Sequence, residues 1–226
     1  MYVQSKIARY KCGAESNTRS ERTRVRLLTT ASRVFAEKGF QNSTIAEICK
    51  QADTNVASIN YHFGDKETMY LEAWRYAFKR ELAHFPPDGG VSPFASPEDR
   101  LAGRIRSLIK RMADNQSYSF AIINREMTHP TRLLVSILEQ DLHPQRMLMI
   151  KLLQECLGCE VNDPLAHYCH ASIMGQCFQL LRLKHGIVAT SDKADTPQPI
   201  DIDAYIDHVV RFSLAGIQAV RSQILN

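Results

Sequence analysis

The stretch from Ser43 to Lys66 holds two short helical patterns with a tight connection, and it constrains the fold more than any other part of the chain. The first pattern begins at Thr44, which has the spacing of a capping box with Glu47. The turn-forming residues Asp53-Thr54-Asn55 follow it. The apolar face of the second pattern consists of Val56, Ile59 and Phe63. Two helices of about two turns each, joined by a short turn, are typical of a helix-turn-helix.

The remaining faces of the second helix carry small or hydrogen-bonding side chains. No carboxylate occurs between Asp53 and Asp65, so this surface suits the major groove of DNA. We expect contacts to bases from Asn55, Val56, Ser58 and Asn60, with Ala57 on the same surface. We expect contacts to phosphates from Thr44, Tyr61, His62 and Lys66. The alternative is a capped helical hairpin whose polar face meets only water.

Positive charge is concentrated at the start of the chain. Residues 1–26 hold seven basic and two acidic residues, a net charge of +5, so the rest of the chain carries −1 of the total of +4. A basic arm before a helix-turn-helix strengthens non-specific attraction to phosphate. For residues 1–18 alone, a solvated flexible tail explains the composition better.

Helical periodicity continues through the rest of the sequence without a convincing strand, which predicts an all-α protein of about nine helices. We expect a flexible basic arm over residues 1–20 and a helix-turn-helix domain with its linking helix over 21–84. Proline and glycine predict a linker loop over 85–96. A second helical domain then fills 97–226.

Within the second domain, Ser96 and Pro97 predict a helix start. Pro144 is expected to kink or split a long apolar pattern, and residues 186–200 to form an exposed loop. The last two helices, over about 163–184 and 201–225, are more apolar than a single-sided surface helix requires. Either they are deeply buried in the monomer, or they form an interface with a second copy of the chain.

Two segments, FAEKGFQNSTIAEICKQA and NVASINYHFGDKETMY, resemble the DNA-binding domain of the TetR family of bacterial transcriptional regulators over roughly residues 23–77. Its pieces Phe-Ala-x-x-Gly-Phe, Thr-x-x-x-Ile and Tyr-x-Phe-x-x-Lys-Glu occur in register. The family usually has glycine where this chain has Asp53; aspartate tolerates a left-handed backbone, so we expect the turn to be kept. The resemblance implies a homodimer, joined through the last two helices, that represses transcription from a palindromic operator.

Residues 124–131 and 157–163 are similar to segments of the CecR (YbiH-like) branch of that family. The branch is associated with sensing small, foreign or toxic compounds and with control of transporters. The resemblance therefore implies a ligand-binding and dimerisation role for residues 97–226, with a small-molecule effector that releases the protein from DNA.

An effector pocket is expected among the helices between Pro97 and Lys184. The candidate lining residues are Phe120, Ile123, Arg125, Met127, Met147, His170, Met174 and Phe178. Methionine and aromatic residues at helical spacing also serve as plain core. Arg125 and its neighbour Glu126 cannot share a helical face. Whichever of the two points inward needs a partner, either a ligand or a structural salt bridge.

A metal- or redox-responsive regulator is an alternative. It rests on a loose group of possible ligands: Cys156, Cys159, His167, Cys169 and His170. Buried cysteine in an intracellular protein usually acts as a small apolar side chain. We therefore expect neither a metal site nor a cofactor.

An enzyme is the alternative from another class. The sequence has no G-x-S-x-G, phosphate-loop or H-E-x-x-H motif, so we expect no catalysis. A helical adaptor without DNA binding fits poorly with the basic arm and the polar second helix. Because no apolar run approaches membrane-spanning length and no signal peptide is visible, we expect a cytoplasmic location without membrane contact.

Overall fold

The computed structural model describes residues 18–159, 164–184 and 200–224, and every regular element in those ranges is helical. This confirms the all-α prediction. The predicted loop over 186–200 and most of the basic arm lie outside the described residues.

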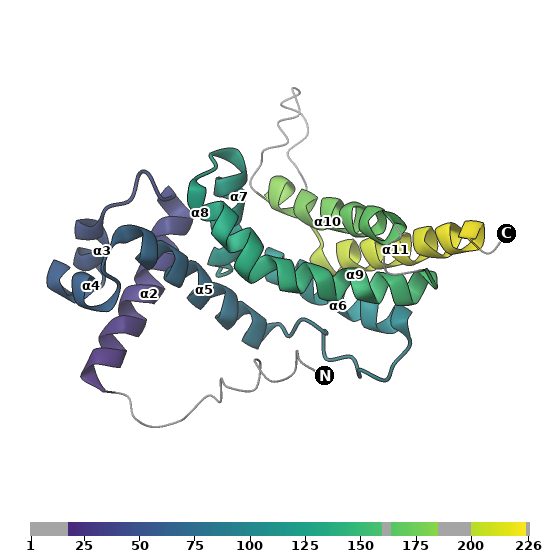
Figure 1. Ribbon diagram of the computed structural model, residues 1–226, viewed down its shortest axis with the longest axis horizontal. Helices are drawn as coiled ribbons and strands as arrows, with labels where there is room; N and C mark the ends of the chain where they lie inside the picture. Colours follow the sequence, from purple (N-terminus) through teal and green to yellow (C-terminus); the bar gives the residue numbers. More distant parts are fainter. Residues whose placement is uncertain (1–17, 160–163, 185–199, 225–226) are drawn as a thin grey trace.

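The first four described helices are α2 (Arg19–Lys38), α3 (Ile45–Gln51), α4 (Val56–His62) and α5 (Lys66–His84). They are followed by α6 (Pro97–Ala113), α7 (Tyr118–Thr128), α8 (Arg132–Ser136), the π-helix Ile137–Leu142, α9 (His143–Leu157), α10 (Pro164–Lys184) and α11 (Ile202–Ile224). In Figure 1, α2–α4 form one end of an elongated molecule, and α10 and α11 the other.

Side-chain caps begin the short helices of the first domain. Thr44, Asn55 and Asp65 each accept a hydrogen bond from the backbone N–H three residues later, at the starts of α3, α4 and α5. Each such cap stabilises a helix by about 1 kcal/mol. The caps matter because two-turn helices are marginal without tertiary contacts. Those contacts come from a core that includes Leu27, Phe35, Ile48, Ile59, Met69 and Trp74.

The turn between α3 and α4 has the predicted left-handed residue. Asp53 has φ +47°, and Arg26 Nη2 of α2 donates to its carbonyl oxygen at 3.0 Å. The prediction that aspartate keeps this turn is confirmed. The hydrogen bond also ties the turn to α2.

The second domain packs α6 against α9, α10 and α11 around its own core. The Ser96 hydroxyl accepts from the Asp99 N–H and caps α6, as the sequence predicted. The linker loop lies against this helix: Ser107 donates to the carbonyl oxygen of Pro86 at 2.6 Å. Gly89 has φ +65°, and a Cβ there would lie 2.3 Å from the carbonyl oxygen of Gly103. Glycine is therefore needed where the loop crosses α6.

Pro144 changes the hydrogen bonding of its helix without ending it. The chain forms a π-helix over Ile137–Leu142, and the N–H of His143 donates to the carbonyl oxygen of Leu138, five residues back. Pro144 then occupies the first turn of α9, where its missing N–H is not needed. The predicted interruption is confirmed, and it takes the form of a wide turn.

Candidate DNA-binding surface and effector region

Helix α4 lies at the outer end of the first domain (Figure 1) and presents most of its side chains to solvent. Ile59 and Phe63 are buried and attach it to the core. Tyr61 is 79% exposed. Val56 is 47% exposed, so its assignment to the buried apolar face is wrong. The helix is held from below by two side chains, while an uncharged outer surface stays free.

Asn55 and Ser58 are partly engaged with each other. Asn55 Oδ1 accepts from the backbone N–H of Ser58 at 3.0 Å and from its hydroxyl at 3.1 Å. The amide nitrogen of Asn55 and a lone pair of the Ser58 hydroxyl remain for an outside partner. The Asn55 side chain is thus both the cap of α4 and a fixed donor at its start.

An open hollow of about 450 Å³ joins α4 to the start of α2. The residues lining it are Arg19, Ser20, Thr23, Asn55, Ala57, Ser58, Tyr61 and His62. The first three were not named as site residues, and Arg19 and Ser20 precede the helix start expected at about Glu21. The helix begins at Arg19, with Thr18 as its cap accepting from the Glu21 N–H. The Thr18-x-x-Glu21 spacing was the signal that would have found this start.

Two predicted phosphate ligands also have structural roles. Thr44 is exposed, but its hydroxyl oxygen caps α3. Lys66 is half-buried, and its Nζ donates to the carbonyl oxygens of Phe40 and Ser43 at 2.5 and 2.6 Å. Burial lowers the pKa of Lys66. The lysine holds the α2–α3 loop to α5, which the sequence did not reveal, and keeps one N–H for another partner.

Helix α7 connects the two domains. Arg125 donates to the carbonyl oxygens of Ala36 and Glu37, at the last turn of α2, where unpaired carbonyls favour a cation. Trp74 Nε1 of α5 donates to the carbonyl oxygen of Ser119 at 3.2 Å.

Of the neighbours Arg125 and Glu126, it is Glu126 that points inward, at 2% exposed. Its partners are the Tyr70 hydroxyl and Thr131. Arg125 is exposed and bonds to the α2 backbone. Arg125 therefore does not line an interior pocket.

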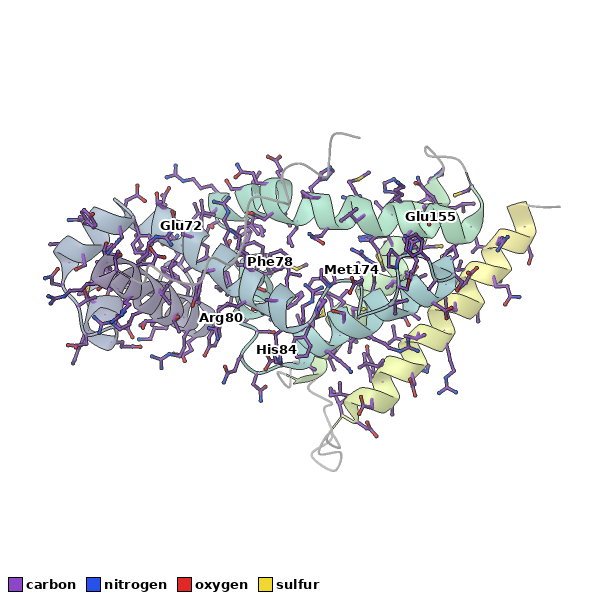
Figure 2. All side chains as sticks on the ribbon, turned by 90° about the horizontal axis from the view of Figure 1, so that it is seen from below. Glu72, Phe78, Arg80, His84, Glu155 and Met174 are labelled. Carbon is purple, nitrogen blue, oxygen red and sulfur yellow. The ribbon has the colours of Figure 1, made fainter. Side chains whose placement is uncertain are left out.

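The other predicted effector residues divide into two groups. Met127 and Met147 are 64% and 44% exposed, so they do not line an interior pocket either, and Ile123 is buried in the core of the first domain. The half-buried residues that remain are Phe120, His170, Met174 and Phe178. The rings of Phe120 and Phe178 meet edge to face, with centroids 6.5 Å apart. Figure 2 shows Met174 near the middle of the molecule, between Phe78 and Glu155.

A second hollow, of about 600 Å³, lies where α2, α5 and the α6–α7 connection meet. Its lining includes Arg80 and Glu81, and Figure 2 shows Arg80 near Phe78 on α5. Glu81 is buried, and it accepts from the backbone N–H of Ser119 at 2.9 Å and from its hydroxyl. Burial raises the pKa of Glu81 to about 7, against the opposing effects of Ser119 and the charge of Arg111.

The cysteine and histidine residues do not converge. In the described ranges, which include all five of the residues proposed as ligands, no three or more such side chains are grouped to hold a metal ion. Burial raises the pKa values of Cys156 and Cys177 to about 12, which leaves both thiols protonated and unreactive. Burial also lowers the pKa of His170. The metal- or redox-responsive alternative has no geometric support.

Two parts of the chain match known protein families. Residues 27–73 match the model for bacterial regulatory proteins of the tetR family. Residues 97–217, more than half of the chain, match the C-terminal domain of the HTH-type transcriptional dual regulator CecR. The chain belongs to the CecR branch of the TetR family. It is a TetR-type transcriptional regulator.

Individual relatives agree with this assignment. The HTH-type transcriptional dual regulator CecR of Shigella flexneri is 31% identical over 155 residues, which cover 64% of this chain and 69% of that protein. A putative transcriptional regulator from Pseudomonas aeruginosa PAO1 shares the fold, with a TM-score of 0.69, 15% identity, and coverage of 91% of this chain and 97% of that one. AibR in complex with isovaleryl coenzyme A and operator DNA gives a TM-score of 0.61 at 17% identity, over 85% and 97% of the two chains.

The regulator has no helix in its described ranges that is both long and apolar enough to cross a membrane.

Proposed function

We propose that this TetR-type regulator binds a palindromic operator as a homodimer, represses transcription, and is released by a small-molecule effector. The observation that carries the DNA-binding part is the surface of α4. Buried Ile59 and Phe63 hold this helix, and its outer side chains are exposed and lack carboxylates. A rigid helix with such a face fits the width and the hydrogen-bonding groups of the major groove.

The contacts divide into base reading and phosphate binding. Asn55, Val56, Ser58 and Asn60 face bases, and Ala57 allows a close approach. Tyr61, His62 and Thr44 bind phosphates, together with the third N–H of Lys66. Arg19 adds a cation across the hollow from Tyr61. Phosphate contacts set the position of the helix, and base contacts set its selectivity.

A homodimer through α10 and α11 is supported by their outer faces. Exposed surface helices normally carry charged side chains. On α10 the exposed residues include the small or aromatic Tyr168, Ala171, Ser172 and Gly175. On α11 an exposed stripe of His208, Phe212, Ala215, Gly216 and Ala219 lies beside the charged residues Asp207 and Arg211. Tyr168 and Phe212 are more than 60% exposed in the monomer. Small residues between aromatic ones allow helices of two copies to pack closely in a two-fold interface.

The division of labour in the chain follows from this arrangement. We assign DNA binding to residues 21–84, with the loop 85–96 as linker, and effector binding and dimerisation to 97–226. The AibR structure holds both isovaleryl coenzyme A and operator DNA, which supports proposing both kinds of partner for this fold. An effector acts only if it binds the free and DNA-bound conformations differently. The contacts of α7 with α2 and α5 connect the proposed effector-binding region to the proposed DNA-binding region.

The proposed role includes no catalysis and no cofactor. A regulator that binds operator DNA acts where the DNA is, so we propose a cytoplasmic location.

The experiment that tests the proposal selects operator DNA from sheared genomic fragments with the full-length protein. We expect enrichment of a palindromic site. Tyr61→Ala then weakens binding to all sequences by about 1.5–3 kcal/mol, the typical value of a hydrogen bond to a charged group, whereas Asn60→Ala mainly relaxes selectivity at one position of each half-site. Arg106→Gln, which removes an exposed charge from α6, is the control and leaves binding unchanged. Unchanged binding by both α4 variants would refute the assignment of this helix.

A further inference from the structure

Arg111 on α6 is a buried cation whose Nε has no hydrogen-bonding partner in the part of the chain that the structure describes. Its side chain is 7% exposed, and its Nε is fully buried and unpaired. The guanidinium makes no ion pair within 4.0 Å among the described residues. Burial lowers the pKa of Arg111 to about 10, so it stays charged at neutral pH. A buried charge and a buried donor both carry a free-energy cost unless an opposite charge or an acceptor reaches them.

The surroundings of Arg111 match one kind of molecule. Its guanidinium carbon lies 5.8 Å from the centroid of the Phe120 ring, which in turn meets Phe178 of α10. Both rings are half-buried although they lie among packed helices. Arg104, two turns earlier on the same face of α6, adds a second cation in a desolvated position. A cation next to two aromatic faces is suited to an organic anion with an apolar or aromatic body.

We propose that the effector of this regulator is an organic anion whose acidic group pairs with Arg111 and whose apolar body lies against Phe120 and Phe178. This inference rests on the proposed function as an effector-responsive regulator, and it names the chemical class of the effector.

The position of Glu81 connects this site to DNA binding. Its charge acts on Arg111, yet the carboxylate accepts its hydrogen bonds from Ser119 and lies outside ion-pair distance. Glu81 belongs to α5, the helix that follows α4. An effector anion beside Arg111 repels the Glu81 carboxylate. Effector binding therefore changes the electrostatic environment of α5, the helix next to the proposed DNA-binding helix α4.

The test compares two fluorescent probes that differ in one group. The first, 8-anilinonaphthalene-1-sulfonate, carries an anionic sulfonate, and the second, N-phenyl-1-naphthylamine, has the same rings without it. Both are titrated into the full-length protein and three variants. We expect Arg111→Met to weaken sulfonate binding at least about ten-fold, the effect of one lost charge-assisted contact, while the affinity for the neutral probe changes less than about two-fold. Arg111→Lys retains most of the affinity, and the exposed Arg106→Met changes neither probe.

Equal weakening of both probes by Arg111→Met would overturn the proposal, because Arg111 would then be a structural residue. Unchanged sulfonate binding would overturn it as well. If Arg111→Met fails to fold, Glu81→Gln provides the second test: removing the competing carboxylate is expected to tighten sulfonate binding several-fold, and an unchanged or weaker affinity contradicts the proposal.

Operator binding is measured on the same samples, so that failure of the anion site can be distinguished from failure of the proposed function. Wild-type protein that binds operator but does not discriminate between the probes refutes the anion site and leaves the regulator intact. Wild-type protein that fails to bind any operator refutes the proposed function, whatever the probes do.

Discussion

Tyr70 on α5 donates its hydroxyl hydrogen bond to Oε1 of Glu126 on α7 at 2.6 Å, and both side chains are almost fully buried. The other carboxylate oxygen of Glu126 accepts from the backbone N–H of Thr131 at 2.8 Å. One carboxylate thus joins α5, α7 and the start of α8. This contact, the bond from Trp74 to Ser119 and the bonds from Ser119 to Glu81 are buried polar links between α7 and α5, the helix that directly follows α4.

Tyr70→Phe removes this hydrogen bond without creating a large cavity. We expect a loss of about 1–2 kcal/mol in the free energy of unfolding, because Glu126 keeps its bonds to Thr131 but loses a buried donor. Urea denaturation followed by circular dichroism measures the loss. Tyr76→Phe is the matched control, since the Tyr76 hydroxyl meets Thr29 in an exposed position. Equal destabilisation by both variants would mean that the buried Tyr70 hydrogen bond contributes no more to the free energy of unfolding than the exposed Tyr76 one.

The stability contribution of Glu81 depends on pH. Its pKa in the folded protein is about 7, above the ordinary value of 4.5, so the folded state holds the proton to higher pH than the unfolded chain does. The contribution of this group is complete below pH 4.5 and is lost as pH rises through 7. Glu81→Gln cannot lose a proton. Its stability relative to wild type should rise with pH over this interval, by up to about 1.4 kcal/mol per pH unit.

Denaturation of both proteins at pH 5, 6, 7 and 8 measures this difference. Arg111 and Asp114 act on Glu81 but are common to both proteins, so the subtraction isolates the one carboxyl. A difference that stays constant from pH 5 to 8 would show that Glu81 titrates normally.

Phe212→Glu places a charge in the outer face of α11. We expect wild-type protein to have twice the chain mass of 25.7 kDa in light scattering, and the variant to be a monomer. The control is Phe94→Glu in the linker loop, where the ring is 95% exposed and lies outside the proposed interface. That variant should remain a dimer. If Phe212→Glu stays dimeric while Phe94→Glu dissociates, the interface has been misplaced.

Arg125→Gln removes the cation from the last turn of α2. The carbonyl oxygens of Ala36 and Glu37 then lose a charged donor, and we expect a loss of about 1 kcal/mol in the free energy of unfolding. Backbone amides at the end of α2 should exchange hydrogen faster, as mass spectrometry of peptides from this region would detect. Arg106→Gln is the control for loss of charge alone. Equal exchange in all three proteins would rule out a role for Arg125 in holding α2.

Local sequence signals predicted the helices well. Thr44, Asn55 and Ser96 are caps in the structure, Asp53 is left-handed, and Pro144 marks a change of helix type. These features depend on residues within four or five positions of one another. Backbone sterics and capping chemistry act over that range, so the sequence alone carries the information.

Long-range contacts could not be predicted in the same way. Nothing near Lys66 in the sequence indicates that its ammonium meets the Phe40 carbonyl, 26 residues earlier. Arg125 lies 89 residues from the carbonyl of Ala36. Met127 met the pattern expected for a lining residue and lies at the surface, because periodicity states which side chains share a face but not what covers that face. The partners of such side chains can therefore be identified only from the tertiary fold.

We propose that α4 reads operator DNA in a dimer. The most direct measurement is fluorescence anisotropy with DNA from upstream of the protein's own gene, over a salt series, for wild type and Tyr61→Ala. We expect saturable binding of one dimer to one palindromic site, a steep loss of affinity with salt, and a weaker affinity for the variant at every salt concentration. Weak binding of equal strength to every sequence, unaffected by Tyr61→Ala, would contradict a DNA-reading role for α4.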